Sequence, residues 1–253
     1  MDDKIQRLMP RFRFGNINPR SGGGFHRGPT YQFYRIVPTD VMEIATVLGL
    51  EDYTAEAVEK AFKNYWRCVD YLVRERVDVI VLGGAPISAR LGRPRVLSLV
   101  KETRERTGIQ LDTPLEAAIA AMKHLGLTKL TIGSRWATSL NDALIRYLGE
   151  GGIEVIGITT RNQGASEAAA MSFEEGLKTA LDVGREAAQL APGAEAVFVP
   201  GGAAMSLHVI PAVEEEFGKP TVTNLSAEVW HNLVRPGVIP PVKGWGRLLA
   251  SSR

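Results

Sequence analysis

Two stretches far apart in the chain share one unusual pattern. "VDVIVLGGAPIS" (77–88) and "EAVFVPGGAAMS" (195–206) are both apolar runs that stop at a Gly-Gly pair followed by alanine. A short apolar run bounded by glycine is typical of a buried strand, and paired glycines let the backbone turn sharply and approach a ligand closely. The repetition predicts a chain of two similar halves, each with its own strand-to-glycine corner.

Around these corners, short apolar runs alternate with amphipathic stretches of helical length, which indicates strand–helix units and parallel sheets. We therefore expect an α/β fold of two pseudosymmetric three-layer halves, each with a mainly parallel sheet flanked by helices and with the site in the cleft between them. The expected division is 1–114, with 226–253 returning to this first half, and 115–225. Strands are expected at 11–17, 31–38, 77–83, 127–133, 153–159, 194–200 and 220–224, and helices at 54–75, 94–107, 114–125, 139–149, 172–190, 205–217 and 226–233.

Length, charge and hydropathy exclude several classes of protein. A chain of 253 residues can bury a sizeable core, and a net charge of +2 with interspersed acidic and basic residues does not indicate a nucleic-acid partner. No apolar run approaches the roughly 20 residues that cross a bilayer, and the first residues lack a signal-peptide core. We expect a cytoplasmic protein with no membrane partner; the periodicity leaves a monomer or a homo-oligomer open.

The glycine corners are the expected ligand site. In open α/β sheets, ligands bind at the carboxyl ends of strands, where glycine lets backbone N–H groups converge on an anion. Facing corners at Gly83, Gly84 and Ala85 and at Gly201, Gly202 and Ala203 would hold a carboxylate from both sides. The alternative is that the glycines serve only tight turns. Neither corner is a nucleotide-binding fingerprint.

A third stretch, Ser134-Arg135-Trp136, lies between an expected strand and helix. The guanidinium can pair with a carboxylate, the hydroxyl can donate to it, and the indole can wall off an apolar substituent. Equally, the arginine can be a surface residue and the tryptophan a core residue.

Few other residues are candidates for a catalytic role. The four histidines lack metal-ligand spacing, so no metal site and no cofactor are expected. His208 follows the second corner on an expected helix and, with Ser134, is a weak candidate for proton transfer. The glycine-rich segment 20–29, which contains His26, is either a mobile lid or a flexible connection. The only cysteine, Cys68, has a helical context typical of a buried structural thiol.

The longest run of informative residues is "EAVFVPGGAAMSLHVIPAVEEEFGKPTVTNLSAEVWHNL" with the closing "GWGRLL". It resembles the C-terminal half of the arylmalonate decarboxylases and, more loosely, of the maleate cis-trans isomerases, both in the aspartate/glutamate racemase superfamily. "FGNINP", "VDVIVLGGAPIS" and "LDTPLEAAIAAMKHLGLTKLTIGSRW" extend the likeness over most of the chain. The resemblance implies two α/β halves with the site between them, and cofactor-free chemistry at a carbon next to a carboxylate.

The resemblance also shows where this chain departs from the family. Family members use one or two catalytic cysteines; here the first falls at Gly83 or Gly84 and the second at Gly201. Glycine supplies neither a nucleophile nor a proton, so two-thiol racemisation is excluded and the known decarboxylation route is disfavoured. The remaining positions implied to bind substrate are Asn18 and Pro19, Ala85 and Pro86 in place of hydroxyl residues, Trp136 in place of tyrosine, Gly202, and Ala203 in place of glycine.

Three functions stay open at this stage. The first is a cysteine-less, cofactor-independent enzyme acting on a small carboxylic acid through an oxyanion-stabilised species, as an isomerase, a decarboxylase or lyase, or a hydrolase. The second is a carboxylate-binding protein or regulator that has lost its chemistry. The third is that Arg135 and the early arginines bind a larger anion, such as a phosphorylated or CoA-linked acid.

Overall fold

Two four-stranded parallel sheets form the framework of the molecule. The computed structural model describes residues 9–20 and 27–252, apart from the side chains of Arg27 and Ala203. The strand orders are β2-β1-β3-β4 and β6-β5-β7-β8, and neighbouring strands pair in parallel. The second sheet thus repeats the order of the first, and the predicted fold class is confirmed. The strands are β1 (Phe12–Asn18), β2 (Val41–Val47), β3 (Val79–Leu82), β4 (Gln110–Asp112), β5 (Lys129–Ile132), β6 (Glu154–Ile158), β7 (Ala196–Val199) and β8 (Thr221–Thr223).

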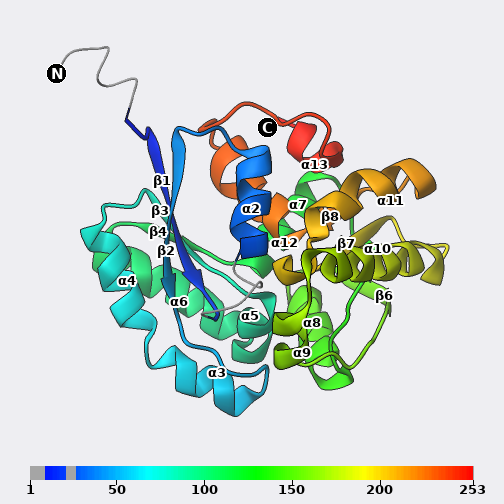
Figure 1. Ribbon diagram of the computed structural model, residues 1–253, viewed down its shortest axis with the longest axis horizontal. Coiled ribbons are helices and arrows are strands. Elements are labelled where there is room, and N and C mark those ends of the chain that lie inside the picture. The colour runs from blue at the N-terminus through cyan, green and yellow to red at the C-terminus, as the bar shows by residue number, and fades with distance from the viewer. Residues whose placement is uncertain (1–8, 21–26, 253) are drawn as a thin grey trace.

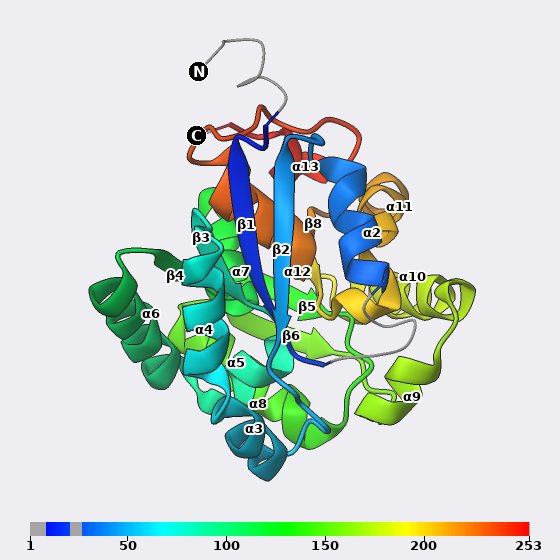
Figure 2. The ribbon, with the colours of Figure 1, turned by 60° about the vertical axis from the view of Figure 1, so that its left-hand side comes forward.

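Helices surround both sheets, and the two halves lie side by side with α2 and α12 between them (Figure 1). In the turned view, β1 and β2 lie in front, with α2 beside β2 (Figure 2). The helices of the first half are α2 (Arg27–Ile36), α3 (Ala55–Phe62), α4 (Tyr65–Arg74), α5 (Ala85–Leu91), α6 (Arg93–Thr107) and α7 (Pro114–His124). Those that follow are α8 (Thr138–Glu150), α9 (Ala165–Ala170), α10 (Phe173–Leu190), α11 (Val209–Phe217), α12 (Asn224–Val229) and α13 (Gly246–Ala250), with short helical turns η2 (Gly202–Ala204), η3 (Ser206–His208) and η4 (Trp230–Val234).

One predicted strand is wrong. Residues 31–38 were expected to be extended, because aromatic and β-branched residues favour strands, but most of the segment belongs to α2. Its buried apolar residues are Phe33, Ile36 and Val37, whereas Tyr31 and Tyr34 are exposed. This spacing of three and four places the buried residues on one face of a helix. The helical spacing of the buried residues therefore determined the structure of this segment, although its residue types favour a strand.

The strand that completes the first sheet, β2, and the short edge strand β4 were not predicted. Residues of β2 are mostly only half-buried, so its sequence lacks the apolar run that marks β3 and β7. The predicted helix at 54–75 is two helices, α3 and α4, interrupted at Lys63 and Asn64. Each of these differences changes an element and leaves the layer order unchanged.

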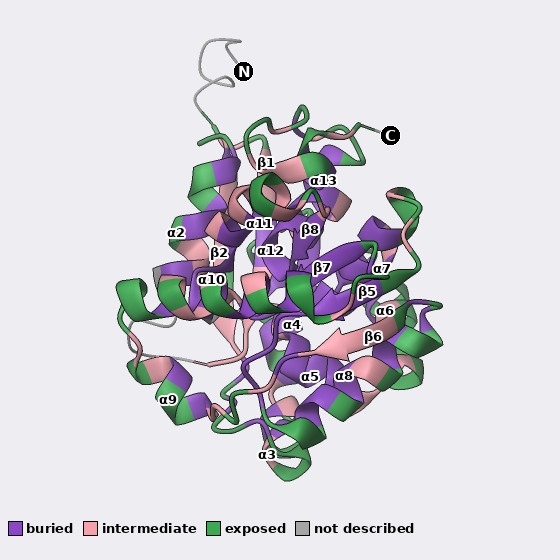
Figure 3. Cartoon of the chain, turned by 90° about the vertical axis from the view of Figure 1, so that its right-hand side faces the viewer, coloured by how far each residue is buried: buried purple, intermediate pink, exposed green. Residues whose placement is uncertain are grey.

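The core is continuous across the two halves. One cluster of buried side chains runs from Phe14 and Leu82 in the first sheet through Trp136 to Phe198 and Trp230. Helix α10 presents a buried face to the sheet and an exposed face to solvent, as its alternating colours show (Figure 3). The halves are therefore joined by shared apolar packing, which contributes roughly 25 cal/mol per Å² of buried surface.

The last part of the chain crosses back between the halves. Helix α12 packs against α7 and α2 as well as β8. At the end of β4, the Asp112 carboxylate is bonded by His231 Nδ1 at 2.9 Å, Asn232 Nδ2 at 2.6 Å and the Thr113 N–H at 2.8 Å. The predicted boundary near 226 stays a prediction. Among the described helices, none has the length and apolar character needed to cross a membrane.

Candidate active site

The two glycine corners have the same backbone conformation. Gly84 follows β3 with φ 94° and ψ 99°, and Gly201 follows β7 with φ 94° and ψ 92°. An L-residue rarely adopts this region, so glycine is required for the backbone to turn there. The matching angles identify Gly84, and not Gly83, as the counterpart of Gly201.

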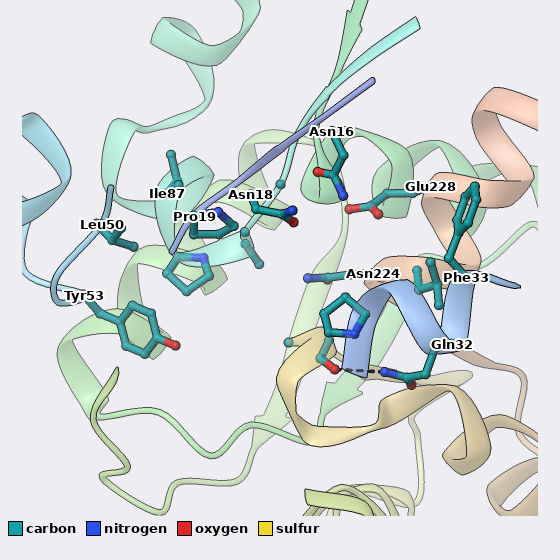
Figure 4. A pocket seen from close by; sticks show the side chains of 18 of the residues that line it. Asn16, Asn18, Pro19, Gln32, Phe33, Leu50, Tyr53, Ile87, Asn224 and Glu228 are labelled. Atoms are coloured by element: carbon teal, nitrogen blue, oxygen red, sulfur yellow. Dashed lines mark hydrogen bonds between the residues drawn. The ribbon is translucent and has the colours of Figure 1, made fainter. Parts of the chain in front are cut away.

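A pocket of about 90 Å³ lies between the corners. That volume holds a few groups of water size and suits a small ligand. Side chains from both halves converge on it (Figure 4). Of the residues predicted from the sequence, those that line it are Asn18, Pro19, Gly83, Gly84, Ala85, Pro86, Arg135, Trp136, Gly201 and Gly202.

Arg135 is the most unusual group in the pocket. Its side chain is buried, with 3% of the residue exposed, yet no carboxylate among the described residues lies within ion-pair distance of it. Its Nε has no hydrogen-bond partner. Burial lowers the pKa of the guanidinium, and the neighbouring Tyr53 hydroxyl opposes that shift. Because arginine stays protonated in proteins, the pocket contains a buried positive charge that has no counter-ion in the part of the chain that the structure describes.

The Arg135 guanidinium lies directly against the second corner. A Cβ built on Gly201 would be 2.6 Å from Arg135 Nη1 and 3.3 Å from Trp136 Cζ2. At the first corner, a Cβ on Gly84 would be 2.6 Å from Pro19 Cγ. The arginine therefore occupies the space that a side chain at position 201 would need.

The remaining predicted site residues are Ser134, His208 and Ala203. The Ser134 hydroxyl donates to Asn141 Oδ1 at 2.7 Å and accepts from the Trp136 N–H at 3.1 Å, which places it in the turn rather than in the pocket wall. His208 is outside the described pocket lining and packs on the Trp245 ring, 5.2 Å between centroids. Burial, followed by the charge of Arg35, lowers the pKa of His208. Ala203 belongs to η2.

His26 and most of the glycine-rich segment lie outside the described residues, so the alternatives of a lid and a flexible connection both stay open there. Gln32 of α2 links the two halves by side-chain hydrogen bonds. Its Nε2 donates to the carbonyls of Gly28 at 3.1 Å and Gly202 at 3.0 Å, while its Oε1 accepts from the Leu207 N–H at 2.8 Å. The second corner is thus held by a side chain of α2.

Most of the pocket wall is apolar. The indole of Trp136 meets the Tyr53 ring at a steep angle, with centroids 6.2 Å apart. Tyr53 is itself held by Arg90, whose Nε donates to its carbonyl at 2.8 Å. Such a wall suits an apolar substituent on the ligand. The remaining apolar lining residues are Phe14, Pro29, Phe33, Leu50, Ile87 and Leu225.

An acidic region of the same pocket was not predicted from the sequence. Glu228 on α12 and Glu43 on β2 both line it. Asn16 Nδ2 donates to Glu43 Oε1 at 2.7 Å, and the Glu228 side chain points toward Asn16 (Figure 4). Burial raises the pKa of Glu228 well above its ordinary value, and the charges of Asp112 and Glu43 raise it further.

Both glutamates carried a sequence signal that could have revealed them. Glu43 is the one charged residue in "VMEIATV", and Glu228 is the one charged residue in "LSAEVW". A carboxylate inside an apolar segment is rarely buried without a reason. Among the described residues, no group of three or more acidic, histidine or cysteine side chains could hold a metal. Cys68 is buried on α4, where its Sγ lies 3.4 Å from the Val47 carbonyl oxygen.

The paired parallel sheets and the pocket between them define a member of the aspartate/glutamate racemase superfamily. More narrowly, residues 32–249 match the sequence profile described as arylmalonate decarboxylase, and the chain belongs to that family. It is 26% identical over 219 residues to the arylmalonate decarboxylase of Bordetella bronchiseptica, covering 86% of this chain and 90% of that protein.

Solved structures agree with this fold. An arylmalonate decarboxylase variant with one glycine changed to cysteine and one cysteine changed to serine, in liganded form, superposes with a TM-score of 0.83 at 24% identity, over 94% of this chain and 98% of the other. The maleate isomerase of Pseudomonas putida S16 with maleate gives 0.78 at 19% identity, over 94% and 97%. The resemblance to these two groups is therefore confirmed.

Proposed function

We propose that this protein is a cofactor-independent enzyme that acts on a small carboxylic acid without a cysteine thiol. The carboxylate lies between the two glycine corners and pairs with Arg135, and an enolate-like anion next to it is stabilised by the same groups. The apolar wall takes the acid's substituent. The family's arylmalonate and maleate relatives support a small carboxylate as the substrate class.

The observation that carries the proposal is the buried guanidinium of Arg135. Leaving a buried charge unpaired is costly, because its desolvation is not offset by a partner. A carboxylate ligand supplies that partner through charge-assisted hydrogen bonds. Fixed donors in a site from which water is excluded then stabilise negative charge that develops during reaction.

The test compares wild-type protein with Arg135→Met. Calorimetry with phenylacetate measures binding, and a turnover panel contains 2-methyl-2-phenylmalonate, maleate and phenylacetate in D2O. We expect Arg135→Met to weaken phenylacetate binding roughly 10- to 100-fold, since hydrogen bonds to charged groups contribute about 1.5–3 kcal/mol.

The same substitution separates binding from folding. Because an unpaired buried charge is removed, we expect Arg135→Met to unfold at the same or a higher urea concentration than wild type in the absence of ligand. Arg161→Met is a matched control, because Arg161 is exposed and pairs with Glu186 on the surface. Equal phenylacetate affinity in Arg135→Met and wild type contradicts the anchoring role. Binding without turnover of any panel acid favours a carboxylate-binding protein or regulator.

A further inference from the structure

Glu228 is the pocket carboxyl group for which the structure shows no charged partner. It lines the pocket from α12, and among the described residues no lysine, arginine or histidine forms an ion pair with its side chain. Glu43, the other carboxylate in the lining, accepts a hydrogen bond from Asn16. A carboxyl group that is withdrawn from water and has no cationic partner favours its neutral, protonated form.

The charged neighbours of Glu228 act in the same direction. Glu43 faces it from β2 and Asp112 from β4, and both disfavour a further negative charge. His231 is bonded to Asp112. On other elements packed against α12, Glu116 of α7 pairs with Arg93, and Arg247 of α13 donates to the Gly218 carbonyl.

A second polar side chain lies one helical turn before Glu228. Asn224 is 6% exposed and lines the pocket, and its Oδ1 has no hydrogen-bond partner. Its amide points into the pocket (Figure 4). Residues four apart lie on one helix face, so α12 presents an unsatisfied amide and a carboxyl group to the same ligand. An unsatisfied buried amide is expected to gain a partner when the pocket is filled.

We propose that Glu228 is the catalytic acid of this site, holding the proton that a thiol would otherwise deliver. This inference rests on the proposed function. With a substituted malonate, the bond between the central carbon and one carboxyl carbon breaks. Carbon dioxide leaves, and the bonding electrons pass into an enediolate paired with Arg135. The Glu228 carboxyl group then gives its proton to the central carbon, a C–H bond forms, and the resulting carboxylate regains a proton from water.

The other described lining groups that could hold or accept a proton have roles of their own, and the Tyr53 hydroxyl interacts with the Arg135 guanidinium. Arg135 stays protonated, and Glu43 is held as an acceptor by Asn16. Ser134 and His208 are outside the described lining. A carboxyl group whose affinity for the proton is raised toward the working pH is a suitable general acid.

The experiment uses 2-methyl-2-phenylmalonate, whose product, 2-phenylpropionate, is chiral. Wild-type protein should yield one enantiomer in excess, because Glu228 delivers the proton to one face. We expect Glu228→Gln to slow turnover by about 100-fold or more, within the usual range for general acid catalysis. Its residual product should be nearly racemic, while phenylacetate affinity changes by less than about threefold. Glu215→Gln, at an exposed position on α11, should behave as wild type.

Two outcomes separate this inference from the proposed function. If wild-type protein turns over the malonate and Glu228→Gln matches it in rate and enantiomeric excess, the role of Glu228 is overturned and the proposed function stands. If wild-type protein turns over no acid, both are overturned. Infrared difference spectra provide a readout independent of turnover. The carbonyl band of a protonated carboxyl group should be present at pH 7 and lost in Glu228→Gln, and its absence from wild type also overturns the role.

Discussion

At the scale of single residues, the site is defined by groups whose usual partners are absent. Arg135 has no carboxylate, Glu228 has no cation, and Asn224 Oδ1 has no donor among the described residues. The sequence indicated Arg135, because its position after a strand is recognisable. For Glu228 the sequence offered only a charged residue inside an apolar segment, and its place in the site depends on the folded chain, which brings Glu43 and Asp112 toward it.

Gly201 is predicted to tolerate no side chain. Gly201→Ala forces an L-residue to a φ of 94° and places Cβ 2.6 Å from Arg135 Nη1. The conformational strain alone is of order 1–3 kcal/mol. Gly108→Ala is the matched control, because Gly108 has a φ of 75° but no atom within 4 Å of the new Cβ. Urea unfolding should show a larger loss for Gly201→Ala; equal losses would mean that the guanidinium moves aside freely.

The pH dependence of stability should report the proton on Glu228. Its pKa in the folded chain is raised, so between the ordinary carboxyl pKa and the raised pKa the folded chain holds a proton that the unfolded chain releases. The free energy of unfolding attributable to Glu228 should therefore fall as pH rises through that window and level off above it. Urea unfolding of wild type and Glu228→Gln at several pH values measures the difference. A difference that stays constant with pH contradicts a raised pKa.

At the scale of elements, the order of layers was predictable and several segments were not. Apolar runs such as those of β3 and β7 mark buried strands, whereas β2 is only half-buried and has no such run. The aromatic segment of α2 resembled a strand, and tertiary packing on Phe33 and Ile36 determined otherwise. The glycine corners were predictable because their backbone geometry requires a particular residue. The pocket-lining residues of α12 were not predictable, because their position depends on how the segment after β8 packs against α7 and α2.

Helix α2 is predicted to fix the second corner through Gln32. Gln32→Leu leaves the Leu207 N–H without the partner it has in the structure, and it removes one of the two donors to the Gly202 carbonyl, which still accepts from the Met205 N–H at 3.3 Å. An unsatisfied buried group costs about 1–3 kcal/mol, so we expect a loss of about that size in urea unfolding, together with weaker phenylacetate binding. Gln189→Leu, at an exposed position on α10, is the control. A loss no larger than that of the control would show that α2 does not hold the corner.

At the scale of the whole molecule, the two halves repeat one topology, and the larger of two clusters of buried side chains spans both halves. The strand orders match, while a single cluster of buried side chains contains residues of both sheets. Such sharing favours cooperative unfolding, because neither half can lose its packing without exposing the other.

Unfolding is therefore predicted to be a single transition. Trp66 reports on the first half, and Trp136 and Trp230 report on the region where the halves meet. Fluorescence and far-ultraviolet circular dichroism should give coincident urea curves, and phenylacetate should shift both to the same extent. Two separated midpoints would indicate that the halves are independent folding units.

The contact between Arg135 and Gly201 limits how this enzyme family can be redesigned from this chain. The two positions compete for one volume, so a thiol introduced at 201 alone requires the Arg135 guanidinium to shift from its present place beside the pocket. Substitutions at 135 and 201 are therefore expected to be energetically coupled. A library that varies both positions together samples combinations that single changes do not reach, and replacing the arginine removes one anion anchor.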